Sequence, residues 1–168
     1  MEKGGGEPAS KVCLFTDGAC LGNPGRGGWA FIITGLPQRA GAALQHSGAV
    51  HASTSNRMEL QAAIEALRTC RSLCPTAAGD VRVTTDSRYL QRGASVWLPR
   101  WKANQWRNAA GRPVKNLVEW KELDLLASAM RPTWHWVKGH SQECAWHARA
   151  DRLARMAARG LHASDAST

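Results

Sequence analysis

Four acidic residues offer this basic chain most of its potential for chemistry. They lie in separate segments, Phe-Thr-Asp-Gly with Asp17, Met-Glu-Leu with Glu59, Thr-Thr-Asp-Ser with Asp86 and Ala-Asp-Arg-Leu with Asp151. Three of the four stand at an end of an apolar run, where a strand or helix would direct them toward one place. Like charges 4 Å apart repel by up to roughly 4 kcal/mol per pair at an effective dielectric near 20. A cluster of these side chains therefore favours a bound divalent cation.

Each carboxylate also has an ordinary explanation. Asp17 and Asp86 are typical turn residues after a strand, and Glu59 in the first turns of a helix complements the helix dipole. Asp151 is spaced to form a surface ion pair with Arg155. The four are informative together only if the fold gathers them.

Composition favours a polyanionic partner. The 168 residues include 22 Lys or Arg against 13 Asp or Glu, a net charge of +9. Nucleic acid is the leading candidate, although a basic protein without a special partner also fits. Five cysteines, an odd number in apolar surroundings, indicate reduced thiols and a cytoplasmic protein. The chain shows neither a transmembrane segment nor the apolar core of a signal peptide, so no membrane association is expected.

The elements that must position the carboxylates follow from the apolar runs. Strands are expected at residues 12–16, 29–34 and 43–50, as an antiparallel meander, and then at 81–85 and 133–137. Thr54 or Ser55 can cap a first long helix, Ser87 starts a short one, and Asn116 can cap another. A last helix over 145–159 ends at Gly160. This order predicts an α/β fold, a mixed sheet with helices on its faces, in one domain at 11–160 between flexible tails at 1–10 and 161–168.

Several motifs in register carry a family resemblance. Besides the four carboxylate motifs, they are Cys-Leu-Gly-Asn-Pro-Gly at 20–25, Trp-Lys at 101–102, Pro-Val-Lys-Asn at 113–116 and Trp-Val-Lys-Gly-His at 136–140. Over residues 11–159 the chain resembles type 1 ribonuclease H, the bacterial ribonuclease HI family. The resemblance implies a five-stranded mixed sheet, with strands 1–3 antiparallel and strands 4–5 parallel. It also implies endonucleolytic hydrolysis of the RNA strand of RNA–DNA hybrids, which gives 5′-phosphomonoesters.

The same resemblance assigns the site. Asp17, Glu59, Asp86 and Asp151 are expected to hold two Mg²⁺ ions in the presence of substrate, with Mn²⁺ as an alternative, and two metals suit an in-line displacement at phosphorus. His140 matches a mobile family histidine that assists proton transfer or product release. Without the resemblance, His140 would be interpreted as an exposed histidine in a loop.

Hybrid binding is expected to use residues 87–118, which contain seven basic residues and no acid. This segment resembles the basic handle of bacterial members, and its tryptophans can pack against sugars or bases or form local core. Trp97 and Trp101 are expected to be partly exposed, and Trp106 more structural. The resemblance also implies that amide side chains contact RNA 2′-hydroxyls and that a separate pocket binds a phosphate of the DNA strand. The residues assigned to substrate are Gly18, Asn23, Thr54, Ser55, Asn56, Trp97, Trp101, Lys102, Lys115 and Asn116.

The chain departs from the family pattern at several positions. Ala52 stands where Arg is often found, Ser55 where Asn is common, and Arg88 where Gln is common. His147, four residues before Asp151, occupies a position where Asn is frequent. The stretch at 141–150 makes this loop one residue longer than in a familiar bacterial member. These changes affect the surroundings and leave all four carboxylates intact.

Three other functions fit parts of the sequence. A non-catalytic module that binds hybrids or duplexes would use the basic face, and another nuclease or an integrase could share the fold. A zinc protein would use Cys70 and Cys74 with His140, Cys144 and His147, although no compact tetrahedral set is evident. The expected partner is an RNA–DNA hybrid, and the protein is expected to be a monomer without an obligate protein partner.

Overall fold

A five-stranded mixed sheet forms the centre of the computed structural model, which describes residues 11–139 and 144–160. The strand order is β3-β2-β1-β4-β5. β1 pairs antiparallel with β2 and parallel with β4, β2 pairs antiparallel with β3, and β4 pairs parallel with β5. The predicted fold class is therefore confirmed. The strands are β1 (Val12–Leu21), β2 (Gly25–Thr34), β3 (Leu44–Ser53), β4 (Val81–Thr85) and β5 (Thr133–Trp136).

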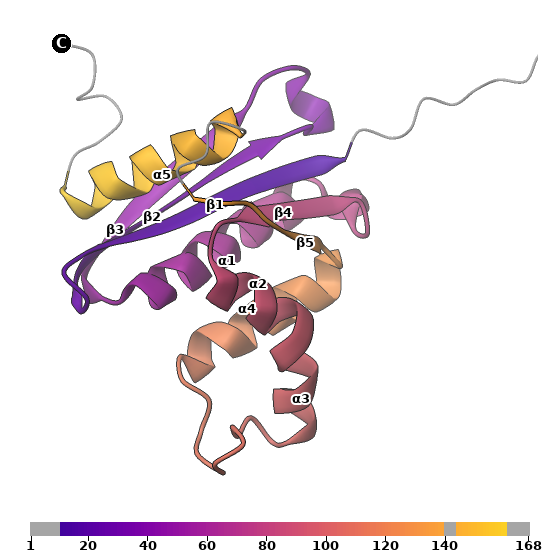
Figure 1. Ribbon diagram of the computed structural model, residues 1–168. Coiled ribbons are helices and arrows are strands. Elements are labelled where there is room, and N and C mark those ends of the chain that lie inside the picture. Colours follow the sequence, from indigo (N-terminus) through magenta and orange to yellow (C-terminus); the bar gives the residue numbers. More distant parts are fainter. Residues whose placement is uncertain (1–10, 140–143, 161–168) are drawn as a thin grey trace, which may run out of the picture.

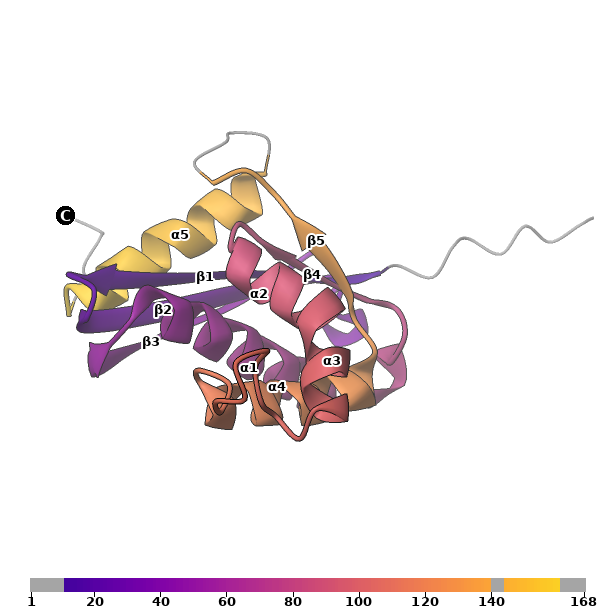
Figure 2. The same cartoon turned by 60° about the horizontal axis from the view of Figure 1, so that its bottom comes forward.

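Helices cover both faces of this sheet. Helix α5 crosses one face, while α1 and α4 pack on the other, and α3 projects away from the sheet (Figures 1 and 2). The α-helices are α1 (Ser55–Leu73), α2 (Arg88–Arg92), α3 (Leu98–Ala103), α4 (Leu117–Met130) and α5 (Ala145–Ala158). The short turns are η1 (Pro37–Arg39), η2 (Pro75–Ala77) and the π-helical η3 (Gly93–Trp97).

The two faces bury separate cores because side chains alternate along each strand. On β2, Phe31 and Ile33 belong to the larger core under α1 and α4, which also contains the fully buried Trp120. Ala30 and Ile32 point the other way and pack with α5 residues such as Ala154. The smaller core is built from small side chains, so α5 can approach the sheet closely.

Strand β1 is longer than predicted, and the predicted strand end at Asp17 is wrong. Asp17 pairs with Ala30 in the middle of β1, which continues to Leu21. The continuation has weak apolar character but pairs with the glycine-rich start of β2, Gly27 and Gly28 among others. The connection between the strands predicted at 12–16 and 29–34 is correspondingly shorter, because backbone pairing rather than side-chain hydrophobicity extends both strands.

The cap predicted at Thr54 and the helix start predicted at Ser87 are confirmed, whereas the side-chain cap predicted at Asn116 is wrong. The Thr54 hydroxyl accepts from the Arg57 N–H at 3.3 Å, and that of Ser87 accepts from the Leu90 N–H at 3.1 Å. Asn116 precedes α4 in the left-handed region, with φ of 56°, and its side chain makes no capping bond. It donates instead to the Tyr89 hydroxyl at 3.1 Å. Gly160, with φ of 77°, ends α5 as predicted.

Two further observations bear on the composition. None of the helices in the described residues is long and apolar enough to cross a membrane. All five cysteines are free thiols.

Candidate active site

The fold gathers the four carboxylates. Asp17 comes from the middle of β1, Glu59 from the first turns of α1, Asp86 from the residue after β4, and Asp151 from α5. All four line one cleft of about 360 Å³. The parallel pairing of β1 with β4 brings Asp17 and Asp86 to one edge, and the two helices close the cleft from opposite faces of the sheet.

Burial and mutual repulsion change the acidity of the inner pair. Asp17 is 3% exposed and Glu59 is 8% exposed. Burial, followed by the charges of Glu59, Asp86 and Asp151, raises the pKa of Asp17 to about 10. The pKa of Glu59 is also raised well above its usual value, mainly by burial and then by Asp86, against a lowering by the Gly18 N–H. Without a cation, Asp17 and Glu59 hold protons that isolated carboxylates would release at neutral pH.

The donor set fits a hard divalent cation. Glu59 Oε2 is buried and has no hydrogen-bond partner among the described residues. A buried carboxylate oxygen without a donor is costly unless a positive charge compensates it. Several carboxylate oxygens around one cleft are the ligands that Mg²⁺ and Mn²⁺ prefer. The four residues could therefore hold such ions.

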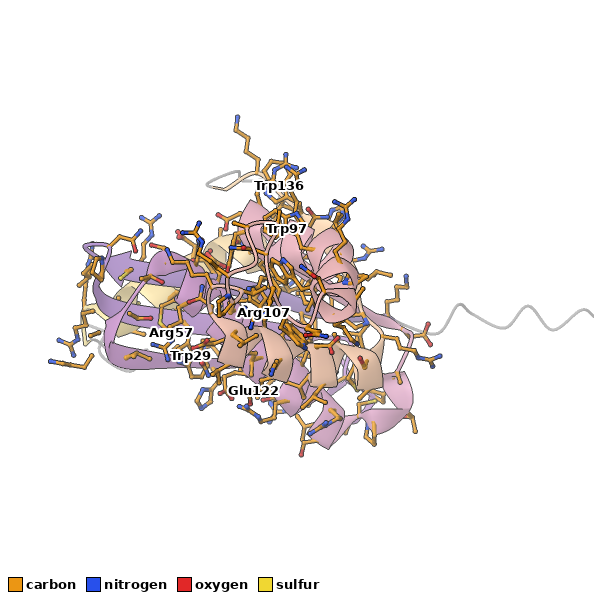
Figure 3. All side chains as sticks on the ribbon, turned by 90° about the horizontal axis from the view of Figure 1, so that it is seen from below. Trp29, Arg57, Trp97, Arg107, Glu122 and Trp136 are labelled. Atoms are coloured by element: carbon orange, nitrogen blue, oxygen red, sulfur yellow. The ribbon has the colours of Figure 1, made fainter. Side chains whose placement is uncertain are left out.

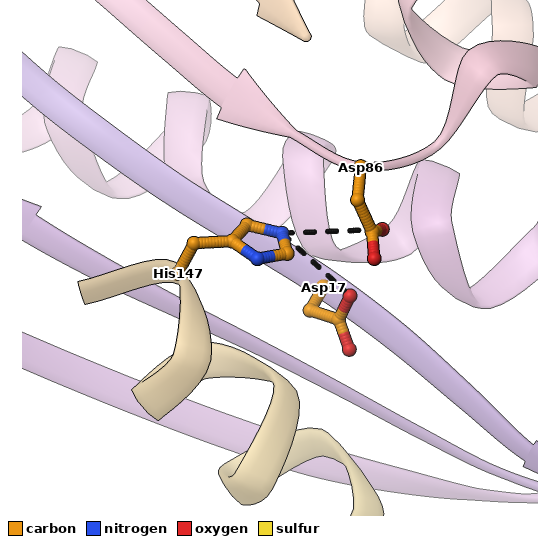
Figure 4. Close-up of side chains that lie close together, drawn as sticks. All are labelled: Asp17, Asp86 and His147. Atoms are coloured by element: carbon orange, nitrogen blue, oxygen red, sulfur yellow. Dashed lines mark ion pairs between the residues drawn. The ribbon is translucent and has the colours of Figure 1, made fainter. Parts of the chain in front are cut away.

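His147 also faces the cluster, and the sequence did not reveal this role. It is 4% exposed on α5, and its Nε2 lies 3.8 Å from Asp17 Oδ1 and 3.9 Å from Asp86 Oδ1 (Figure 4). The available signal was its position four residues before Asp151, which puts both side chains on one side of a helix.

The chain around Asp86 is braced from β5. Trp136 Nε1 donates to the Asp86 carbonyl oxygen at 2.8 Å, and the Arg88 guanidinium lies 3.5 Å from the centre of the Trp136 ring. A Cβ on Gly139 would lie 2.5 Å from Asp86 Oδ2, so this position has no room for a side chain. Arg88, one of the departures from the family pattern, thus stacks on the residue that holds Asp86.

The outer side of the cleft is positively charged. Arg155 Nε donates to Asp151 Oδ1 at 2.9 Å, the ion pair expected from the spacing. Arg155 and Arg159 both line the cleft beside the carboxylates. Asp151 therefore takes part in a surface pair and in the acidic cluster at once.

Residues predicted to contact RNA lie together beside the cleft. Asn23, in the β1–β2 turn, accepts through Oδ1 from the Ser55 N–H at 3.2 Å, and Asn56 is the next residue along α1. Gly18 lies against the start of α1, where an added Cβ would be 2.4 Å from the Glu59 N atom. The missing side chain of Gly18 therefore lets β1 pack closely against the first turns of α1.

The handle contains a second candidate surface. Trp97 and Trp101 are partly exposed, as predicted, and Trp106 is equally half-buried. Trp101 also packs edge-on against Trp120 with ring centroids 5.2 Å apart. A groove of about 290 Å³ opens here, on the segment labelled by Trp97 and Arg107 in Figure 3. Its lining residues are Trp97, Arg100, Trp101, Asn104, Arg107 and Ala109.

The other residues predicted to bind substrate differ in exposure and in the contacts that they already make. Thr54 and Asn116 stand at the starts of α1 and α4, two helices that pack together. Lys115 is exposed, whereas Lys102 Nζ already pairs with Asp124 Oδ2 at 2.9 Å. His140 lies outside the described residues.

A zinc site is not formed by the described candidates. Cys70 and Cys74 are buried at the end of α1, where burial raises the pKa of Cys70 to about 11 and keeps its thiol protonated. Within residues 11–139 and 144–160, the one group of three potential ligands close enough to share an ion is Asp17, Asp86 and His147. His147 thus joins the acidic cleft.

Fold and site together define an α/β protein of ribonuclease H-like architecture with an acidic cleft. The RNase H family description matches residues 9–159, and the chain belongs to this family. The predicted family and enzyme class are thereby confirmed.

Individual relatives agree along almost the whole chain. Ribonuclease H of Cupriavidus necator is 46% identical over 145 residues, which cover 86% of this chain and 92% of the relative. Ribonuclease H of Treponema pallidum subsp. pallidum is 45% identical over 157 residues, covering 88% and 90%. The crystal structure of LC9-RNase H1, a type 1 RNase H with the type 2 active-site motif, has a TM-score of 0.71 at 32% identity, covering 93% of this chain and 75% of that one.

Proposed function

We propose that this protein cleaves the RNA strand of RNA–DNA hybrids endonucleolytically and leaves 5′-phosphomonoesters. The observation that carries the proposal is the cleft in which Asp17, Glu59, Asp86 and Asp151 converge. Buried carboxylates on a chain of net charge +9 repel a phosphodiester unless cations accompany it. This charge arrangement favours a nuclease over a module that only binds nucleic acid.

The four carboxylates would hold two Mg²⁺ or Mn²⁺ ions. When bound, such a pair supplies an activated water and stabilises the leaving oxygen. Asp17, the most buried of the four, fixes the inner side of the cleft, while the guanidinium groups of Arg155 and Arg159 line its outer side, where a phosphate would lie. His140 is proposed to assist proton transfer or product release.

The hybrid would be held on two sides of this cleft. Asn23, Ser55 and Asn56 offer amide and hydroxyl groups to RNA 2′-hydroxyls, with Gly18 beside them. On the DNA side, cations and tryptophan faces of the handle groove suit a phosphate backbone and its sugars. The residues proposed for DNA contact are Thr54, Trp97, Trp101, Lys102, Lys115 and Asn116. Five free thiols favour a reducing compartment, so we also propose that the protein is cytoplasmic. We propose separately that it acts as a monomer.

A substrate comparison tests this function. One labelled sequence is offered as RNA–DNA hybrid, RNA duplex, DNA duplex and single strand, with and without Mg²⁺. We expect cleavage only of the RNA in the hybrid and only with the metal. Asp17→Asn should abolish cleavage and leave hybrid binding largely intact, while the exposed Asp80→Asn serves as the matched control. Cleavage of duplex DNA alone, or hybrid binding without cleavage, would refute the proposal.

A further inference from the structure

We propose that His147 is a nitrogen ligand of a divalent cation shared with Asp17 and Asp86, and that it shifts the metal preference of this site from Mg²⁺ toward transition ions such as Mn²⁺. The inference rests on the proposed function, because it concerns the same cleft. It adds a ligand of a different donor type to a site otherwise made of carboxylates.

The separations suit a shared ion better than direct hydrogen bonds. His147 Nε2 lies 3.8 Å from Asp17 Oδ1 and 3.9 Å from Asp86 Oδ1, beyond hydrogen-bond length. One ligand atom from each residue lies within 4.8 Å of the other two. Three ligand atoms this close together can contact one common ion at ordinary metal–ligand lengths.

The backbone holds the imidazole in this position. His147 lies within α5, whose Ala150 and Ala154 are fully buried against Ala30 and Ile32 of the sheet. The side chain is 4% exposed, so it cannot swing out to water without disturbing that packing. Its ring is directed at Asp17 and Asp86 (Figure 4).

Donor chemistry then predicts the preference. Mg²⁺ is bound through oxygen and keeps several waters, whereas imidazole is a good ligand for first-row transition ions. An Asn at position 147 would offer only an amide oxygen. Replacing it with an imidazole should therefore strengthen binding of Mn²⁺ and change binding of Mg²⁺ little.

Metal binding by the whole protein provides the test. Calorimetric titration of metal-free protein with Mn²⁺ and with Mg²⁺ compares the wild type, His147→Asn and the exposed-histidine control His135→Asn. We expect His147→Asn to lose at least about tenfold in Mn²⁺ affinity and to keep its Mg²⁺ affinity within about twofold. The control should match the wild type in both, and circular dichroism checks folding.

A spectroscopic readout identifies the ligand independently of affinity. Electron spin-echo envelope modulation of bound Mn²⁺ should show coupling to a histidine nitrogen in the wild type, and nitrogen-15 labelling of histidine should alter it. The coupling should survive His140→Asn and vanish in His147→Asn. Absence of this coupling in the wild type, or its persistence in His147→Asn, would overturn the proposal even if that variant folded poorly.

Hybrid cleavage separates this inference from the proposed function. If wild-type protein cleaves hybrid with Mg²⁺ but Mn²⁺ shows no histidine coupling, the nuclease function stands and the role of His147 falls. If histidine coupling is present but no hybrid is cleaved, the ligand stands and the nuclease function falls.

Discussion

Asp17→Asn should stabilise the metal-free protein, increasingly so as the pH rises. The folded protein raises the pKa of Asp17 from 3.8 to about 10, chiefly through burial. Between these values the folded state keeps a proton that the unfolded chain has released. The stabilisation linked to this proton is fully present below pH 3.8 and is lost progressively as the pH rises toward 10.

The magnitude follows from the number of protons. One retained proton lowers the free energy of unfolding by about 1.4 kcal/mol per pH unit, so about 4 kcal/mol is lost between about pH 5 and about pH 8. Asp17 is 3% exposed, so solvent screening reduces this little. The figure is an upper bound for Asp17 because Asp17 and Glu59, whose pKa is also raised, titrate as a pair. In a domain of this size it corresponds to a fall in Tm of up to about 8–16 °C.

Thermal unfolding followed by circular dichroism in a chelator measures this effect. The Tm of the wild type should fall across this pH range, and that of Asp17→Asn should fall less, so that the variant is the more stable at the upper end. Asp80→Asn, an exposed aspartate, should follow the wild type. Added Mg²⁺ should restore the wild type at high pH and affect Asp17→Asn much less. Parallel pH profiles for wild type and Asp17→Asn would refute the reasoning.

Three further perturbations test how the site is built. Gly139→Ala should reduce hybrid cleavage at least about tenfold with little change in Tm, because its Cβ would lie 2.5 Å from Asp86 Oδ2 and displace that carboxylate; unchanged kinetics would contradict this. Gly28→Ala should destabilise the protein by about 1–3 kcal/mol in denaturant unfolding, since its Cβ would lie 2.1 Å from the Ala154 carbonyl oxygen; a wild-type midpoint would show that α5 can shift freely. Replacing Arg107 with Gln should weaken hybrid binding and reduce the magnitude of the slope of log affinity against log salt by roughly one unit. An unchanged slope would show that Arg107 does not contact a phosphate.

Much of the fold was predictable because each element carries a local signal. Val81 and Val83 give the run at 81–85 an apolar inner face, and Thr54 and Ser87 cap helices through side chains of the expected type. The continuation of β1 beyond Asp17 was not predictable in this way. Gly18, Ala19 and Cys20 are small and half-exposed, and the pairing with the start of β2 makes this stretch a strand.

The identities of the site residues were predictable from the sequence to a greater extent than their arrangement in space. Motif order identified the four carboxylates, since each stands in a recognisable short motif. In the sequence, His147 stood out only as a departure from the family pattern. The burial and direction of its side chain depend on how α5 packs on the sheet. The bond from Trp136 to the Asp86 carbonyl oxygen depends on the parallel pairing of β4 with β5. That pairing joins segments about 50 residues apart, a contact that local patterns do not encode.

Glycines explain how one small cleft can hold four acids from four elements. At Gly18 the backbone of β1 meets the start of α1, which brings Glu59 in, and at Gly28 β2 meets the backbone of α5, which carries Asp151. At Gly139 the missing side chain leaves room for the carboxylate of Asp86. A Cβ at Gly18 or Gly28 would come within 2.4 Å of a backbone atom, so the approach of the two helices is set by backbone contacts, while a Cβ at Gly139 would meet a side-chain oxygen. The repulsion among the acids is therefore imposed by packing elsewhere, which is how a folded protein keeps a cation site assembled before the cation arrives.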